Sequence, residues 1–228
     1  MQPDYQLITS FDNDKGAFDL TIISTNALVN EIISKLGVFN YSSLDKIHPN
    51  PNRIFKPLIK YDNGTYQGEY DTVKKQKDGK GRFILQNGTV YDGFWKNDLK
   101  DGFGRFILYN GNYYISEWKN GKLNGYGKYY YINGKIYEGQ FLNDKKEGIG
   151  LLTWHNGNQY YGQWVNGNRQ GVGVYTFKSG DILLGQWMNN QLHGIVMVIP
   201  KNGGQIEIRR YQNYQLIQKL LKIDNAQK

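Results

Sequence analysis

Apolar and polar residues alternate along most of the chain, in segments that return at a fixed spacing. Tyr91, Gly93 and Trp95 stand two residues apart, so on an extended strand they lie on one face. Residues 102–108 alternate in the same way. The polar stretch between them contains Asn97-Asp98, which is typical of a hairpin turn, and Asn110-Gly111 follows as a second turn signal. The pattern therefore predicts a two-stranded β-hairpin.

This hairpin is repeated every 23 residues. The motif at 91–95 returns in related form at 114–118, 137–141, 160–164 and 183–187, and a Gly-x-Gly pair follows the first four copies at the same distance. An earlier unit begins at Tyr66, and partial units lie at both ends. Units that repeat in this way stack on their neighbours. The expected fold class is an all-β repeat, an antiparallel β-meander of 23-residue hairpins over residues 55–212, with six full units and two partial ones.

Glycine in a strand lets another group approach the backbone, so the aromatic rings are expected to lie over the Gly-x-Gly strands. These rings and glycines form the expected core of the repeats. The residues assigned to this core are Tyr66, Gly68, Tyr91, Gly93, Trp95, Tyr114, Trp118, Tyr137, Gly139, Phe141, Tyr160, Gly162, Trp164, Gly185 and Trp187.

The opposite face of the sheet carries a second set of residues. It is mostly polar on the first strand of each unit and often apolar on the second. An apolar band across several repeats is typical of a protein-docking surface, and the alternative is that the chain's own flanks cover it. The residues expected in this band are Phe103, Ile107, Tyr126, Tyr130, Ile149, Leu151, Val172, Val174, Ile195 and Met197.

The flanks have patterns of their own. Residues 18–23 resemble a strand, and the apolar spacing over Thr25–Leu36 predicts a helix that ends at Gly37. The apolar spacing over Asn213–Ile223 predicts a second helix, which would cap the last strand or grip a partner helix. The expected domains are a flank with one helix and a linker (1–54), the repeat sheet (55–212), and a capping helix and tail (213–228).

Composition narrows the function classes. The chain has no cysteine, which excludes disulfides and thiol chemistry, and no apolar run of membrane-spanning length. Its formal charge of +8 is scattered among acidic residues, which suits a solvated surface better than a nucleic-acid site. The expected partners are therefore other proteins, with weak contact to an anionic membrane, and no nucleic acid.

Candidate chemistry is sparse. Gly102-Phe103-Gly104 continues as Arg105-Phe106-Ile107, which matches neither a dinucleotide fingerprint nor a P-loop. The histidines His48, His155 and His193 have no second ligand at metal-binding spacing on their own strand faces. Acidic residues recur with the repeat, which indicates architecture rather than one active site. We therefore expect no enzymatic activity, cofactor, metal or small-molecule substrate.

The repeat resembles the MORN repeat (membrane occupation and recognition nexus), whose opening Tyr-Glu-Gly is matched literally by Tyr137-Glu138-Gly139. The sequence departs from that pattern at Ser116, at Val196 and throughout 206–212. The resemblance covers about two-thirds of the chain. It implies an elongated, twisted β-meander made of successive hairpins, to which the two predicted flanking helices are added.

The resemblance also implies a function. MORN proteins of this size resemble structural, non-enzymatic scaffold subunits of larger assemblies, above all in the radial spoke heads of ciliary axonemes. The implied location is cytoplasmic, at a cilium, axoneme or other cytoskeletal structure. Two alternatives stay open, namely a membrane-surface module that binds phospholipid and a regulatory subunit of a separate enzyme.

Overall fold

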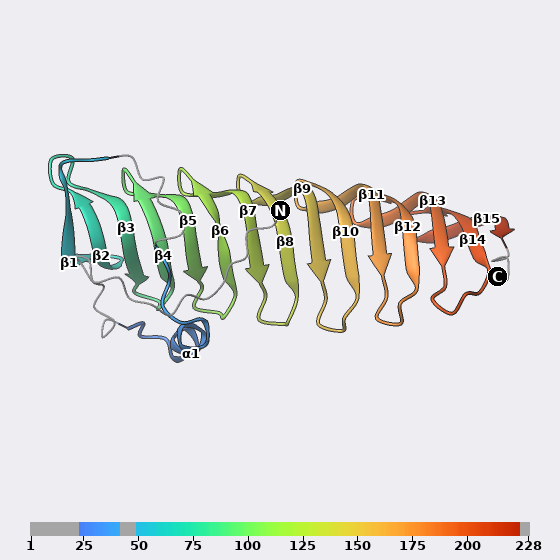
Figure 1. Cartoon of the computed structure of the whole chain (residues 1–228), viewed down its shortest axis with the longest axis horizontal. Coiled ribbons are helices and arrows are strands. Elements are labelled where there is room, and N and C mark those ends of the chain that lie inside the picture. Colours follow the sequence, from blue (N-terminus) through green and yellow to red (C-terminus); the bar gives the residue numbers. More distant parts are fainter. Residues whose placement is uncertain (1–22, 42–48, 224–228) are drawn as a thin grey trace. The chain divides into compact units, whose positions relative to one another are not determined.

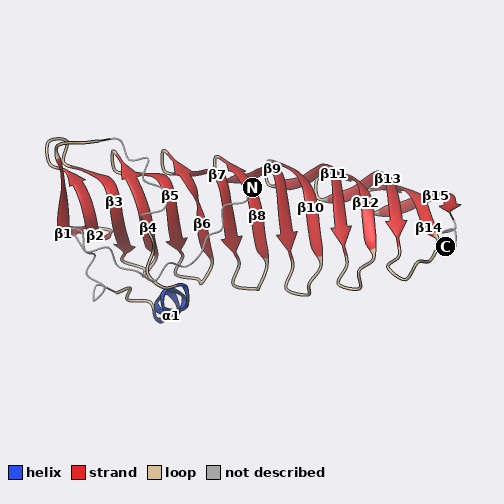
Figure 2. Cartoon of the chain, in the orientation of Figure 1, coloured by secondary structure: helices blue, strands red, loops and turns tan. Residues whose placement is uncertain are grey.

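The computed structural model describes residues 23–41 and 49–223, and within those ranges the chain forms one α-helix and fifteen β-strands (Figures 1 and 2). Within each of the chain's two compact units, every strand hydrogen-bonds to its neighbours in sequence, and the paired strands run antiparallel. The all-β antiparallel meander predicted from the repeat is confirmed. The strand expected at 18–23 falls almost wholly outside the described residues.

The chain divides into two compact units, residues 1–122 and 123–228. Unit 1 contains helix α1 (Ala27–Leu36) and strands β1 (Arg53–Tyr61), β2 (Gly64–Asp71), β3 (Gln76–Leu85), β4 (Val90–Lys96), β5 (Leu99–Ile107) and β6 (Tyr113–Lys119). Unit 2 contains β7 (Lys122–Tyr130, starting at the boundary), β8 (Ile136–Leu142), β9 (Lys145–Thr153), β10 (Gln159–Val165), β11 (Asn168–Thr176), β12 (Ile182–Met188), β13 (Gln191–Ile199), β14 (Ile206–Gln212) and β15 (Gln215–Ile223).

Two kinds of turn alternate along the strands, and both follow from the sequence. Asn97-Asp98 joins β4 to β5 with φ values of 50° and 66°, as the two central residues of a type I′ turn require. The turn from β5 to β6 closes by a hydrogen bond from the Gly111 N–H to the Leu108 carbonyl (3.0 Å). Gly111 has φ of 83°, a value that glycine adopts without steric cost.

Aromatic rings lie over glycines inside each hairpin. A side chain added at Gly104 or Gly93 would clash with the Tyr91 ring, so only glycine leaves room for it. The Tyr91 hydroxyl donates to the Phe94 carbonyl (3.1 Å), and the ring meets Trp95 edge-on at 5.1 Å. It also meets Trp118 of the next 23-residue repeat at 5.6 Å. Burying one such ring contributes about 1.5–3 kcal/mol, so this contact stabilises successive hairpins against each other.

Helix α1 lies beside the strand ends of unit 1 (Figure 1). Asn26 caps it, because its Oδ1 accepts a hydrogen bond from the Val29 N–H (3.1 Å), and the helix ends at Gly37 as predicted. The apolar side of α1 packs on Ile84, Val90 and Ile107, with Val29 fully buried among them. The predicted helix is thus present and starts two residues later than expected.

The C-terminal flank differs from the prediction. Residues 215–223 form strand β15, which pairs with β14 from Gln212↔Gln215 to Ile206↔Ile223, so the predicted capping helix is wrong. Asn213-Tyr214 forms another type I′ turn, with φ values of 48° and 66°. A helix of about ten residues is marginal in water, whereas pairing with β14 satisfies a whole row of backbone groups.

Candidate protein-docking surface

One row of side chains crosses unit 2 on the face opposite the aromatic core. Its members face each other in cross-strand register, from β9 to β13. Tyr161 is 56% exposed and Leu184 is 38% exposed, while the other three members are half-buried. We call this set the open row, and it consists of Leu151, Tyr161, Val174, Leu184 and Met197.

A second apolar set runs beside the open row. Ile149, Val172 and Ile195 occupy equivalent repeat positions and are 44%, 55% and 42% exposed. Each lies where its strand bulges, and a glutamine of the preceding strand supports the bulge at Val172 and at Ile195. The Gln163 Oε1, for example, accepts a hydrogen bond from the Val172 N–H (3.1 Å). The backbone N–H in the bulge therefore has a hydrogen-bond acceptor within the protein, and the apolar side chains face solvent.

The same register row in unit 1 is charged and buried. Arg82 pairs with Asp92 across β3 and β4, and Asp92 pairs with Arg105 across β4 and β5. The Arg82 Nε lies 2.6 Å from the Asp92 Oδ1, and the Arg105 Nη2 lies 2.8 Å from its Oδ2. Burial opposes ionisation of Asp92, but the two guanidinium groups outweigh it and hold its pKa below the usual range.

The chain's own N-terminal flank covers this buried row. The Arg105 Nη1 donates to the Gly37 carbonyl (2.8 Å), just past the end of α1. The Phe39 ring stacks on Phe103 at 6.0 Å, and Tyr41 packs edge-on against Phe94 at 5.9 Å. In unit 1, the chain's own N-terminal flank therefore covers this face of the sheet. This is the alternative that the sequence analysis left open.

The predicted docking residues consequently divide between the two units. Ile107 is fully buried beneath α1, so its assignment to a docking face is wrong, and Phe103 is half-buried beneath Phe39. Tyr126 and Tyr130 are half-buried, and the Tyr126 hydroxyl donates to the Glu138 Oε1 (2.7 Å). The remaining predicted residues lie in the two apolar rows of unit 2. The sequence analysis did not predict Tyr161 and Leu184, because it selected apolar residues from the second strand of each 23-residue repeat, and these two lie on first strands.

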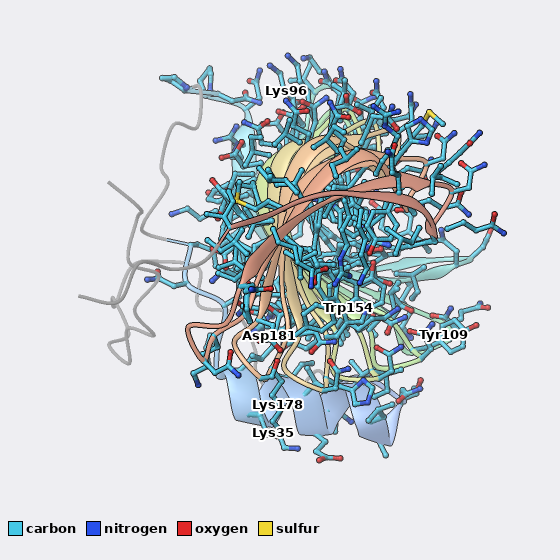
Figure 3. All side chains as sticks on the ribbon, turned by 90° about the vertical axis from the view of Figure 1, so that its right-hand side faces the viewer. Lys35, Lys96, Tyr109, Trp154, Lys178 and Asp181 are labelled. Atoms are coloured by element: carbon cyan, nitrogen blue, oxygen red, sulfur yellow. The ribbon has the colours of Figure 1, made fainter. Side chains whose placement is uncertain are left out.

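The structure buries the predicted repeat core, with Tyr114 half-buried as the exception. It also reveals a core position that the sequence reading missed. Lys77, Lys100, Lys146 and Arg169 recur at multiples of 23 residues, and their cationic groups lie over aromatic rings. Arg169 lies 4.4 Å from the Trp187 ring centre and 5.6 Å from that of Trp154. Trp154 lies closer to the strands than Lys178 and Asp181 of the β11–β12 turn (Figure 3).

No group of three or more potential metal ligands comes together in residues 23–41 and 49–223. No helix within those ranges is long and apolar enough to cross a membrane. His155 is exposed and His193 half-buried, while His48 lies outside the described part.

Comparisons with known proteins agree with the repeat. The sequence model of the MORN repeat matches residues 66–90, 91–113, 114–136, 137–159, 160–182 and 184–195. None of the curated proteins compared with the chain matches it.

Two solved structures show distant similarity. The SAS-4 (dCPAP) TCP domain of Drosophila melanogaster, solved with a proline-rich motif of Ana2 (dSTIL), has 16% identity and a TM-score of 0.38, over 78% of this chain and 99% of that one. A mutant TCP10 domain of Danio rerio CPAP has 10% identity and a TM-score of 0.30, over 79% and 99%.

The six matched segments span more than half of the sequence and coincide with the strands that carry the aromatic core. Such repeats are non-catalytic modules for contact with proteins or membranes. The chain belongs to the MORN-repeat family.

Proposed function

We propose that this protein is a non-enzymatic scaffold that docks another protein on the open row of unit 2. The observation that carries the proposal is the contrast between two equivalent rows. In unit 1 the row is sealed by the chain's own flank, whereas in unit 2 Tyr161 and Leu184 stay exposed. Exposed apolar side chains that line one cross-strand row in this way are typical of interaction sites.

The composition of the open row suits a protein partner. Tyrosine is enriched among residues that dominate binding energy, and here Tyr161 is flanked in register by Leu151 and Val174. The exposed Ile149 and Val172 extend the apolar area along the same strands. Because these residues project from paired strands, they are held in place before a partner arrives.

The finer proposal concerns the assembly. We infer a subunit of a ciliary axoneme or another cytoskeletal structure, located in the cytoplasm. The support is the resemblance to short MORN proteins of radial spoke heads, together with a chain that consists largely of repeats. Identification of the proteins that copurify with the endogenous protein tests this assignment.

The docking surface is tested with Tyr161→Ser combined with Leu184→Ser. Both side chains are exposed, so the fold should persist, while copurification of the partner should be lost. Ile132→Ser is the matched control, because Ile132 is 62% exposed in a turn outside the open row. Retention of the same partners by the double variant would contradict the proposal.

The two other functions give different outcomes. A membrane-surface module would sediment with anionic phosphatidylserine vesicles at low ionic strength and be released by salt. A regulatory subunit would copurify with an enzyme whose activity changes when the open row is altered.

A further inference from the structure

Lys146 occupies a cage of aromatic rings on β9. Its Nζ lies 4.8 Å from the Trp164 ring centre, 4.9 Å from that of Tyr137 and 5.5 Å from that of Tyr131. The backbone pairs Lys146 with Phe141 of β8, which places the side chain on the core face. The amine is thus surrounded by apolar ring surface and only partly reached by water.

Two cations lie near Lys146. Lys135 lies over the same Tyr131 ring at 5.0 Å, and Arg169 lies over Tyr160 at 5.4 Å. Within the described part of the chain, no carboxylate pairs with Lys146, and the adjacent Glu147 instead accepts a hydrogen bond from the Asn166 N–H (3.0 Å). Burial, reinforced by Lys135 and Arg169, lowers the pKa of the Lys146 amine to about 8.

At two of the three equivalent repeat positions, the cation over the rings also has a polar partner. Lys77 also lies over rings, but its Nζ is 3.0 Å from the Asp98 Oδ1. Arg169 donates from its Nη2 to the Asn190 carbonyl (2.7 Å) and to the Tyr214 hydroxyl (3.0 Å). Lys146 instead combines a ring cage, two neighbouring cations and no carboxylate partner. A lysine desolvated beside another cation is activated as a nucleophile.

We propose that Lys146 is a lysine-acylation site that reacts with acyl thioesters. The unprotonated Nζ attacks the thioester carbonyl, a C–N bond forms, and the C–S bond breaks. The departing thiolate takes up the proton that the nitrogen loses, so the products are an amide and a thiol. The amide cannot be protonated at neutral pH, so the modified side chain no longer carries the positive charge of the ammonium form.

Lys145 is the internal control. It is adjacent in sequence but exposed, and its Nζ reaches the Asn166 Oδ1 (3.3 Å). At pH 7.4 an amine with a pKa near 8 is about 20% unprotonated, against about 0.1% for an ordinary lysine. The weaker base is also a weaker nucleophile, so we expect a net rate advantage of about tenfold for Lys146, taking thiol behaviour as a guide.

The experiment incubates the full chain with acetyl-coenzyme A and follows acetylation of each lysine by mass spectrometry, after digestion beside acidic residues. Lys146 should acetylate about tenfold faster than Lys145 at pH 7.4, and its rate should level off above pH 8 while that of Lys145 keeps rising. Equal or slower reaction at Lys146, or a rate that keeps rising to pH 10, would overturn the proposal.

A second variant tests whether the neighbouring cations, rather than the accessibility of the Lys146 amine, determine its acetylation rate. Lys135→Gln removes one neighbouring cation from a turn and leaves the aromatic cage in place. We expect the plateau to move to higher pH and the rate at Lys146 to fall severalfold at pH 7.4. An unchanged profile in this variant would contradict the role of the neighbouring cations.

Discussion

The two units of this protein use equivalent rows of the repeat in opposite ways. In unit 1 the row holds Arg82, Asp92 and Arg105, all buried beneath the N-terminal flank. In unit 2 the register equivalents include Tyr161 and Leu184, both exposed. Charges are inside and apolar groups are outside, the reverse of the usual distribution. The same backbone repeat therefore accepts either charged or apolar side chains on this face. Which kind occurs depends on what covers the face.

The largest expected effect comes from breaking the buried row of unit 1. Asp92→Ala leaves two guanidinium groups buried without a counter-charge, which should destabilise the protein by about 3–5 kcal/mol. Urea denaturation measures the loss, and Asp62→Ala, at an exposed turn, is the control. A loss below about 1 kcal/mol would mean that the row is not sealed from water.

A smaller effect is expected from loosening the cover itself. Val29 is fully buried beneath α1, so Val29→Ser should cost about 2 kcal/mol and expose the apolar surface on Ile84, Val90 and Ile107. Binding of the dye ANS should then increase. Leu28→Ser, one residue away and 36% exposed, should change neither quantity. Identical behaviour of the two variants would show that α1 does not seal unit 1.

The strands, turns and core could be predicted from the sequence, because the 23-residue spacing determines them together, but the contrast between the two rows could not. Tyr91 and Gly104 could be placed from their spacing alone. The cover over Arg105 could not, since it depends on Gly37 and Phe39, which are far away in sequence. The helix predicted over 213–223 failed for a related reason. Its apolar spacing suits a helix, but the unpaired edge of β14 offers a complete row of hydrogen bonds.

The stability effect expected at Lys146 in unit 2 depends on pH. Its pKa is lowered in the folded protein to about 8, so the unfolded chain binds more protons between pH 8 and about 10.5. The contribution of this residue to stability should therefore rise across that window, by at most about 2–3 kcal/mol. Denaturation of the wild type and of Lys146→Met over this pH range isolates the effect. A constant difference between the two curves would contradict the lowered pKa.

Site-specific photo-crosslinking tests the central claim most directly. The photoreactive amino acid p-benzoylphenylalanine is placed at Leu184 in the open row and, as a control, at Lys178 in an exposed turn. The protein is irradiated together with its copurified partner. We predict a crosslink to the partner from position 184 and none from position 178. A crosslink from position 178 alone would contradict the assignment of the open row as the docking surface.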